Sequence, residues 1–308
     1  MTTTTAKSKG PKKTLPLLLL AAPGLLYFII NSYIPMIGIF IAFKDINYAK
    51  GIFRSDWIGF DNFKFLFQTS DAWIMTRNTL LYNVAFIVLG TILSILIAIL
   101  MSELLSKAFS KIFHTSLILP NLISMVVLSY LVFAFLNADS GFINNSILIP
   151  LGLPEINWYS EPQYWPFLLV FIQLWKTAGY GSIVYIAFIA GIDKSVYEAA
   201  KIDGAGKLKQ IWTITLPLLK PTIAILTLMS IGRIFNSDFG LFYQVPLNSG
   251  ALYSTTQTID TYVYRALMQV NDIGMSAAAG LYQSLVGFIL VMVANAIVKK
   301  VNADNALF

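Results

Sequence analysis

The chain has 308 residues, of which 57% are hydrophobic and only 12% are charged, and its formal net charge is +6. Since a soluble domain carries about a quarter charged residues, this composition excludes an ordinary soluble protein and indicates an integral membrane protein. Cysteine is absent and His114 is the only histidine, which excludes disulfides, thiolate metal sites and multi-histidine metal clusters.

Six segments are long and apolar enough to cross a membrane, which takes about 20 predominantly apolar residues. In chain order they cover residues 15–43, 78–101, 112–136, 164–192, 218–235 and 276–298. The first contains Pro16, Pro23 and Pro35, so we expect a tilted or kinked helix there. It also follows a basic start, as a signal peptide does, but the apolar run is too long for one and we expect it to be an uncleaved span. The prediction is an all-α integral membrane fold.

The placement of lysine and arginine orients these spans. Thirteen lysines fall in the two terminal tails and around the loops that follow the second and fourth spans, whereas six basic residues fall in the other loops. Lys176 and Arg233 lie within spans. Basic residues collect on the cytoplasmic side, so we expect a multi-pass protein with both termini in the cytoplasm. The positive charge is thereby explained by topology, and nucleic acid is not an expected partner.

The loops on the opposite side differ in character. Residues 44–76 are rich in tryptophan and phenylalanine, which favours an interfacial helix at headgroup level. Residues 137–163 contain many Asn, Pro and Gly and predict an ordered external loop. Residues 237–275 are mainly loop-like, with a short helix expected at 261–270.

A polar segment between the fourth and fifth spans contains the most specific pattern. Ser195 and Glu198 have the spacing of a capping box, which predicts a helix that begins at Ser195. Gly204 can end that helix in the left-handed conformation. Asp203 lies near its C-terminus, where the helix dipole disfavours a carboxylate, unless Asp203 caps the next helix instead. We expect a short helix on the cytoplasmic side that presents itself to a partner.

The residue pattern of this segment resembles that of one protein family. The pattern E-A-A-x3-G-x9-I-x-L-P, over residues 198–217, resembles the coupling-helix signature of the permease subunits of binding-protein-dependent ABC importers. The flanking I-D-G-A at 202–205 and L-P-L-L-K-P at 216–221 are most similar to carbohydrate-uptake permeases of the maltose type. The six spans and the F-N-S-D-F at 235–239 extend the likeness over nearly the whole chain. It looks especially like the subgroup that imports oligosaccharides from plant or algal polysaccharides.

The resemblance implies a type I ABC importer permease fold, and it implies that other subunits supply ATP hydrolysis and substrate delivery. It divides the chain into a cytoplasmic tail (1–14), the first helix with its external aromatic loop (15–76), a permease core (77–300) with a coupling helix at 195–206, and a second cytoplasmic tail (301–308). The chain has no G-x4-G-K-[ST], so ATP and Mg²⁺ would be bound by a partner ATPase. Implied partners are an ATPase dimer, a second and different permease chain, an extracytoplasmic sugar-binding protein and membrane lipid. In the coupling helix, the residues implied to dock on the ATPase are Glu198, Ala199, Ala200, Asp203 and Gly204.

The sugar path is sought among polar and aromatic residues within the spans, because sugars are bound by aromatic faces and hydrogen-bonding groups. A lysine at mid-membrane costs about 2.5–3.5 kcal/mol to insert, so Lys176 should face a cavity or a partner. Arg233 and Asp238 could pair with each other or line the path, and an acidic, uronate-type sugar would make Lys176 and Arg233 counter-charges. The full set of path candidates is Trp175, Lys176, Tyr180, Arg233, Asn236, Asp238 and Gln283.

Two other functions are left open by the residues. The Glu-Ala-Ala segment is shared with permeases for other solutes, such as oligopeptides or polyamines. A secondary transporter that works without ATP would need an ion-coupling carboxylate in mid-membrane, and the spans offer no convincing one. A membrane enzyme is least favoured, since no nucleophile and base are paired in the sequence.

Overall fold

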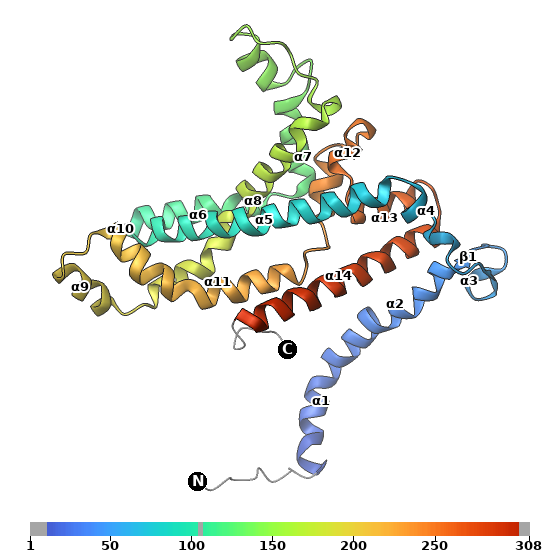
Figure 1. The fold of residues 1–308 in the computed structure, drawn as a ribbon, viewed down its shortest axis with the longest axis horizontal. Helices are drawn as coiled ribbons and strands as arrows, with labels where there is room; N and C mark the ends of the chain where they lie inside the picture. Colours follow the sequence, from blue (N-terminus) through green and yellow to red (C-terminus); the bar gives the residue numbers. More distant parts are fainter. Residues whose placement is uncertain (1–10, 104–106, 302–308) are drawn as a thin grey trace.

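The computed structural model describes residues 11–103 and 107–301, and most of this part of the chain is helical (Figure 1). Five helices are long and apolar enough to span a membrane: Leu18–Phe43, Asp71–Ser102, Pro162–Ala190, Lys207–Ile231 and Ile273–Ala296. They correspond to five of the six predicted spans. The tails expected at 1–14 and 301–308 fall largely outside the described residues, and residues 11–14 already form the first turn of a helix.

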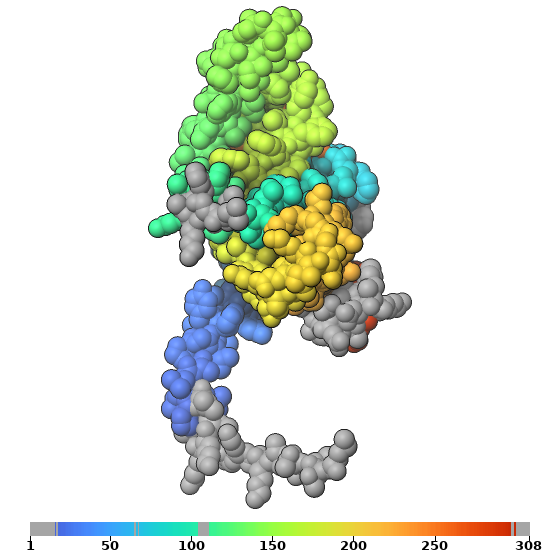
Figure 2. Space-filling model, turned by 90° about the vertical axis from the view of Figure 1, so that its left-hand side faces the viewer, coloured from blue at the N-terminus to red at the C-terminus, as the bar shows by residue number. Residues whose placement is uncertain are grey.

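The N-terminal span is one long helix with local changes of winding. It runs through α1 (Pro11–Phe28), a π-helical turn η1 (Ile29–Tyr33), α2 (Ile34–Met36) and a 3₁₀ segment η2 (Ile37–Phe43). Figure 1 shows a bend between α1 and α2, as the three prolines predict. η2 packs against the C-terminal helix, whereas α1 stands away from the rest of the molecule (Figure 2).

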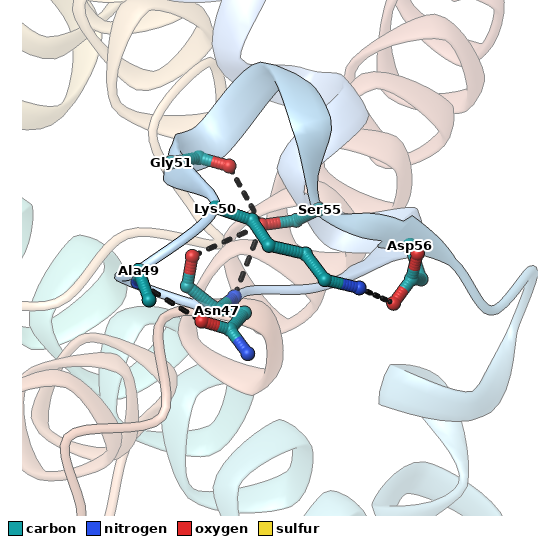
Figure 3. A network of polar contacts seen from close by, with 6 residues as sticks. All are labelled: Asn47, Ala49, Lys50, Gly51, Ser55 and Asp56. Carbon is teal, nitrogen blue, oxygen red and sulfur yellow. Dashed lines mark hydrogen bonds and ion pairs between the residues drawn. The ribbon is translucent and has the colours of Figure 1, made fainter.

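The aromatic loop contains no long interfacial helix. It forms a two-stranded antiparallel sheet, β1 (Lys44–Asp45) and β2 (Asp56–Trp57), with short helices α3 (Gly51–Arg54), η3 (Asp61–Phe63) and α4 (Phe65–Gln68). Figure 3 shows the polar contacts that close the loop between the strands: Ser55 Oγ donates to the Gly51 carbonyl at 2.8 Å, and Lys50 pairs with Asp56 at 2.6 Å. Gly51 has a φ of +75°, which favours glycine at this turn.

The main bundle is built from α5 (Asp71–Ser102), α6 (Lys107–Leu122), α8 (Trp165–Ala190), α11 (Leu216–Ile231) and α14 (Ile273–Val301). α8 packs against α5 and α6, and α11 packs against α5, α8 and α14. The largest buried cluster of the described residues lies where α5, α8 and α7 (Met125–Leu136) meet, around the fully buried Trp165 and Leu169. α5 begins seven residues before the predicted start of its span at Asn78.

The third predicted span, 112–136, is not one helix. α6 ends at Leu122, α7 (Met125–Leu136) begins three residues later, and the two axes meet at 95°. Pro120 lies in the last turn of α6, and Ser124 caps α7 by accepting a hydrogen bond from the Val127 N–H at 3.3 Å. Figure 1 shows α7 leaving the bundle sideways. Taken as one broken span, this pair makes six candidate spans, as predicted, but the apolar run contains a helix end and a new cap that its composition does not show.

The remaining loops are ordered by short helical turns. Between α7 and α8 lie η4 (Asn144–Leu148), η5 (Trp158–Ser160) and η6 (Pro162–Tyr164), in line with the predicted ordered loop. Between α11 and α14 lie η8 (Gly240–Gln244), η9 (Gly250–Leu252), α12 (Tyr253–Thr256) and α13 (Ile259–Met268). The short helix expected at 261–270 is α13.

At the opposite end of the bundle, α8 is followed by the exposed helix α9 (Lys194–Ile202). A turn then leads into α10 (Lys207–Gln210), the π-helical turn η7 (Ile211–Thr215) and α11, which together form a continuous helix over Lys207–Ile231. Pro217 follows η7 inside this helix, where it cannot donate a backbone hydrogen bond, and the local π-helical winding of η7 accommodates it. The fifth span therefore ends at Ile231, four residues before its predicted end.

Candidate functional site

α9 begins earlier than its sequence pattern suggested. Asp193 is the N-cap: its Oδ1 accepts the Ser195 N–H at 2.9 Å. Hydrogen bonds from the backbone N–H and side chain of Ser195 lower the pKa of the Asp193 carboxyl. Ser195 lies within the helix, so the capping box predicted from Ser195 and Glu198 was wrong. An aspartate at the true cap competes with a serine two residues later, and sequence spacing alone does not choose between them.

α9 ends as predicted, at a left-handed glycine. Gly204 has a φ of +77°. The Ala205 N–H donates to the Ala200 carbonyl at 2.9 Å and the Gly204 N–H donates to the Lys201 carbonyl at 3.1 Å, the hydrogen-bond pair of a Schellman motif. Asp203 is the C-cap of α9, and Gly206, not Asp203, precedes α10. The alternative role of Asp203 as a cap for the next helix is therefore wrong.

The surface of α9 is solvated on nearly all sides. No residue of α9 is buried, Glu198 and Ala199 are exposed, and Ala200 is half-buried. Two apolar side chains beside Gly204 are also exposed, Ile202 at 86% and Leu208 at 75%. Sequence reasoning missed both, although an isoleucine and a leucine set among lysines and glycines were a signal. Such exposed apolar groups on a short polar helix favour a surface that another protein covers.

A cavity of about 550 Å³ lies between α5, α8 and α11. Its walls are mainly apolar, with Arg233 as the only charged side chain among the described residues that line it. Gln173 also lines it, and its Oε1 is buried without a hydrogen-bond partner in the described part of the chain. The hydrogen-bonding side chains of the wall are Thr91, Ser94, Gln173, Thr177, Tyr180, Tyr185, Ser230 and Arg233. An apolar cavity with a few polar groups is typical of a small-molecule site.

Two of the predicted path residues, Tyr180 and Arg233, line this cavity, and Trp175 and Lys176 do not. Lys176 is 8% exposed. Its ammonium donates to the backbone carbonyls of Asn121, at 3.1 Å, and of Pro120 and Ile123, where α6 ends. The buried ammonium thus has three backbone carbonyls at the end of α6 as acceptors, which explains how its charge is tolerated.

Of the other three path candidates, Asn236 and Asp238 lie in the turn that follows α11, and Gln283 lies on α14 with its side chain directed to that turn. Gln283 Nε2 donates to Asn236 Oδ1 at 3.0 Å and to Asp260 Oδ1 at 3.2 Å. Asp238 Oδ1 accepts the Leu241 N–H at 3.1 Å. Asp238 and Arg233, both within the described part of the chain, form no ion pair with each other. This network fixes the turn beyond the cavity, and the structure places none of the three on the cavity wall.

The sequence matches a known protein family over most of its length. Residues 87–303 match the family described as binding-protein-dependent transport system inner membrane component. The protein LplB of Bacillus subtilis (strain 168) is 35% identical over 94% of this chain and 90% of its own length. The polygalacturonan/rhamnogalacturonan transport system permease protein YteP of the same organism is 35% identical over 94% of this chain and 89% of its own.

Two solved structures resemble the fold of this chain over most of its length. A chain of a bacterial ABC transporter involved in the import of the acidic polysaccharide alginate has a TM-score of 0.84 at 33% identity, covering 94% of this chain and 97% of that one. A structure of the bacterial alginate ABC transporter in complex with alginate pentasaccharide-bound periplasmic protein gives 0.83 at 32%, covering 94% and 96%. These similarities take in both the helices around the cavity and those at the ends of the bundle.

Proposed function

Because this chain belongs to the family of binding-protein-dependent transport system inner membrane components, we propose that it is the transmembrane subunit of an ABC importer for oligosaccharides. Its fold is that of a type I ABC importer permease. It is a multi-pass protein of the inner membrane, with both termini on the cytoplasmic side. The observation that carries the proposal is α9, an exposed polar helix joined directly to a spanning helix that lines a cavity.

A partner ATPase binds α9 and moves this subunit through that contact. ATP and Mg²⁺ are bound by that partner, since the chain carries no phosphate-binding loop motif. Glu198 supplies a charged contact, and Ala199, Ala200 and Gly204 let the ATPase approach closely. Asp203 adds a second carboxylate at the end of the helix, and Ile202 and Leu208 extend the contact with apolar area. Closure of the ATPase dimer then displaces α9 and switches the access of the cavity.

The other partners follow from the architecture of such importers. A second permease chain, different from this one, lies beside it in the membrane, and an extracytoplasmic sugar-binding protein delivers the substrate. The binding protein is supported by the alginate transporter complexed with its periplasmic protein. α1 stands away from the bundle and exposes leucines along its length, which supports contact with lipid or with the second permease.

The substrate class is an acidic oligosaccharide of the uronate type. YteP is named for polygalacturonan and rhamnogalacturonan, and the similar solved transporter imports alginate. In this chain, Arg233 supplies a positive charge on the cavity wall. Lys176 is held by three carbonyls, so we assign the counter-charge to Arg233. Tyr180 and Gln173 offer a ring and an amide to the sugar.

Reconstitution of the complete importer tests the function. With the ATPase subunits, the second permease and a sugar-loaded binding protein, ATP hydrolysis should rise when the binding protein is added. Ile202→Ser should weaken binding of the ATPase by at least about tenfold, because burying an isoleucine side chain is worth about 1.5–3 kcal/mol. Glu198→Ala should lower stimulated hydrolysis while the chain still inserts in the membrane.

A matched control replaces an exposed apolar residue far from α9. Leu153→Ser, in the loop before η5, should bind the ATPase as the unmodified chain does. Equal ATPase affinity for the Ile202 and Leu153 variants would contradict the docking assignment. Absence of any stimulated hydrolysis with the unmodified chain would contradict the importer itself.

Arg233→Gln tests the substrate class. We expect it to reduce uptake of a galacturonate trisaccharide by at least about tenfold and to leave uptake of a neutral trisaccharide near the unmodified level. The reason is that only the acidic sugar loses an ionic partner, and a charge-assisted hydrogen bond is worth about 1.5–3 kcal/mol. Uptake into vesicles of both labelled sugars is the measurement. An equal loss for the two sugars would show that Arg233 has a structural role instead.

A further inference from the structure

The connection between α9 and the helix over Lys207–Ile231 is the four residues 203–206, of which the last three are small. Gly204, with a φ of +77°, Ala205 and Gly206 form a turn, and the space beside both glycines is open, with no described atom within 4 Å of an added Cβ. Glycines resist bending less than other residues. If this turn were the only connection, a displacement of α9 would bend the turn and would not move the helix over Lys207–Ile231.

One side-chain contact bridges the turn. The Tyr197 hydroxyl, on α9, and Thr215 Oγ1, at the end of η7, lie 2.9 Å apart and share a hydrogen bond. Thr215 is 4% exposed, and Tyr197 is half-buried on a helix that is otherwise nearly all exposed. A second contact, from Gln210 Nε2 to the Ala205 carbonyl at 2.7 Å, fixes the turn itself but does not reach α9.

A surface ion pair is the competing link in this region. Lys207 Nζ and Glu103 Oε2 are 2.6 Å apart and join α10 to the residue after α5. Their side chains are 71% and 42% exposed, so the pair is screened by solvent. It also lies on the far side of the turn from α9. The link that holds α9 to the long helix is therefore the hydroxyl pair.

We propose that the Tyr197–Thr215 hydrogen bond is a brace that makes α9 and the helix over Lys207–Ile231 move as one body. This inference rests on the proposed function. The helix has 25 residues and is roughly 37 Å long. Near its far end, Ser230 and, just beyond it, Arg233 line the cavity. With the brace intact, a displacement of α9 by the ATPase reaches these two side chains. Tyr197 and Thr215 are positioning residues, since neither lines the cavity.

The test uses Tyr197→Phe in the complete reconstituted importer, because this change removes only the hydroxyl. The ratio of sugar imported to ATP hydrolysed should fall about fivefold, as expected when an equilibrium loses one hydrogen bond of ordinary net strength. Binding of the ATPase should stay unchanged. Hydrogen exchange at the amides of residues 203–205 should become faster, because the turn opens more often.

Variants of the partner residue sharpen the result. Thr215→Val should match Tyr197→Phe, Thr215→Ser should keep the ratio, and the double variant Tyr197→Phe with Thr215→Val should be no worse than either alone. The matched control is Tyr130→Phe, an exposed tyrosine on α7, which should leave the ratio and the exchange at 203–205 as they are.

The outcomes separate the brace from the importer. An unchanged ratio and unchanged exchange in Tyr197→Phe, with a working unmodified importer, would overturn the brace alone. Loss of ATPase binding in Tyr197→Phe would also overturn it, because the tyrosine would then be a docking residue. If the unmodified chain supports no stimulated hydrolysis, the proposed function fails, and the exchange measurement still decides whether the hydroxyl pair holds the turn.

Discussion

Replacing Gly179 with alanine is expected to destabilise the helix bundle more than a Gly→Ala change at any other described glycine. An alanine Cβ at Gly179 of α8 would lie 1.9 Å from the Leu117 carbonyl oxygen and 2.5 Å from its carbon, both backbone atoms of α6. Real Cβ atoms do not approach so closely, so α6 or α8 must move. Overpacking of this kind costs about 1–3 kcal/mol where side chains can yield, and here the obstacle is backbone.

The displacement would also separate Lys176 from the carbonyls at the end of α6. Lys176 lies three residues before Gly179 on the same helix, and its ammonium would be left buried with fewer acceptors. We therefore expect a thermal midpoint in detergent that is lower by several degrees, or loss of the monodisperse folded chain altogether.

Gly24→Ala is the matched control. Gly24 lies in α1, and no described atom is within 4 Å of its added Cβ. Its thermal midpoint should be equal to or above that of the unmodified chain, because alanine is favoured over glycine in a helix by about 1 kcal/mol. A Gly179→Ala chain with an unchanged midpoint would mean that α6 and α8 are not packed as closely as the structure has them.

Gly204→Val should give the largest loss of coupled ATP hydrolysis. A β-branched residue is strongly disfavoured at the φ of +77° that Gly204 adopts. The chain would leave the left-handed conformation, and the two hydrogen bonds of the Schellman motif at the end of α9 would break. Ile202 and Glu198 would then face the ATPase in altered positions. Stimulated hydrolysis in the reconstituted importer should fall at least tenfold, with roughly 1.4 kcal/mol as the corresponding free energy.

Gly206 provides the control within the same turn. Gly206 has a φ of −66° and a ψ of 165° at the N-cap of α10, a conformation that serine adopts readily. Gly206→Ser should keep stimulated hydrolysis near the unmodified level. If both variants lose hydrolysis equally, the cause is bulk in the turn and not the left-handed conformation. If neither loses it, the ending of α9 at Gly204 has no part in docking.

Much of the fold could be predicted because spanning helices are specified locally. An apolar run of the required length determines a helix in lipid, where every backbone group must find its partner within the segment. Six spans were predicted on this ground, and five of them are single spanning helices, including the helix around Trp165 and the bent N-terminal one with its three prolines. The end of α9 at Gly204 is equally local, since it depends on the one residue that accepts a positive φ without strain.

The site was predicted in part. The residue pattern around Glu198-Ala199-Ala200 predicted a short helix, and this helix, α9, is present and exposed. Of the path candidates, Tyr180 and Arg233 line the cavity, whereas Gln283 is engaged in a network with Asn236 and Asp260. Sequence spacing shows which side chains lie in the membrane. It does not show which carbonyl or amide from a distant helix will meet them.

What the sequence by itself determined is therefore the membrane class, five of the spanning helices and the exposed helix α9 that ends at Gly204, since each depends on interactions within a few consecutive residues. The tertiary structure decided the carbonyl partners of Lys176, the cavity wall and the Tyr197–Thr215 contact. These join residues 18 to more than 100 positions apart, as Tyr197 with Thr215 and Thr91 with Arg233 do. Their partners are selected only when whole helices pack, because close packing fixes which polar groups are left to satisfy one another.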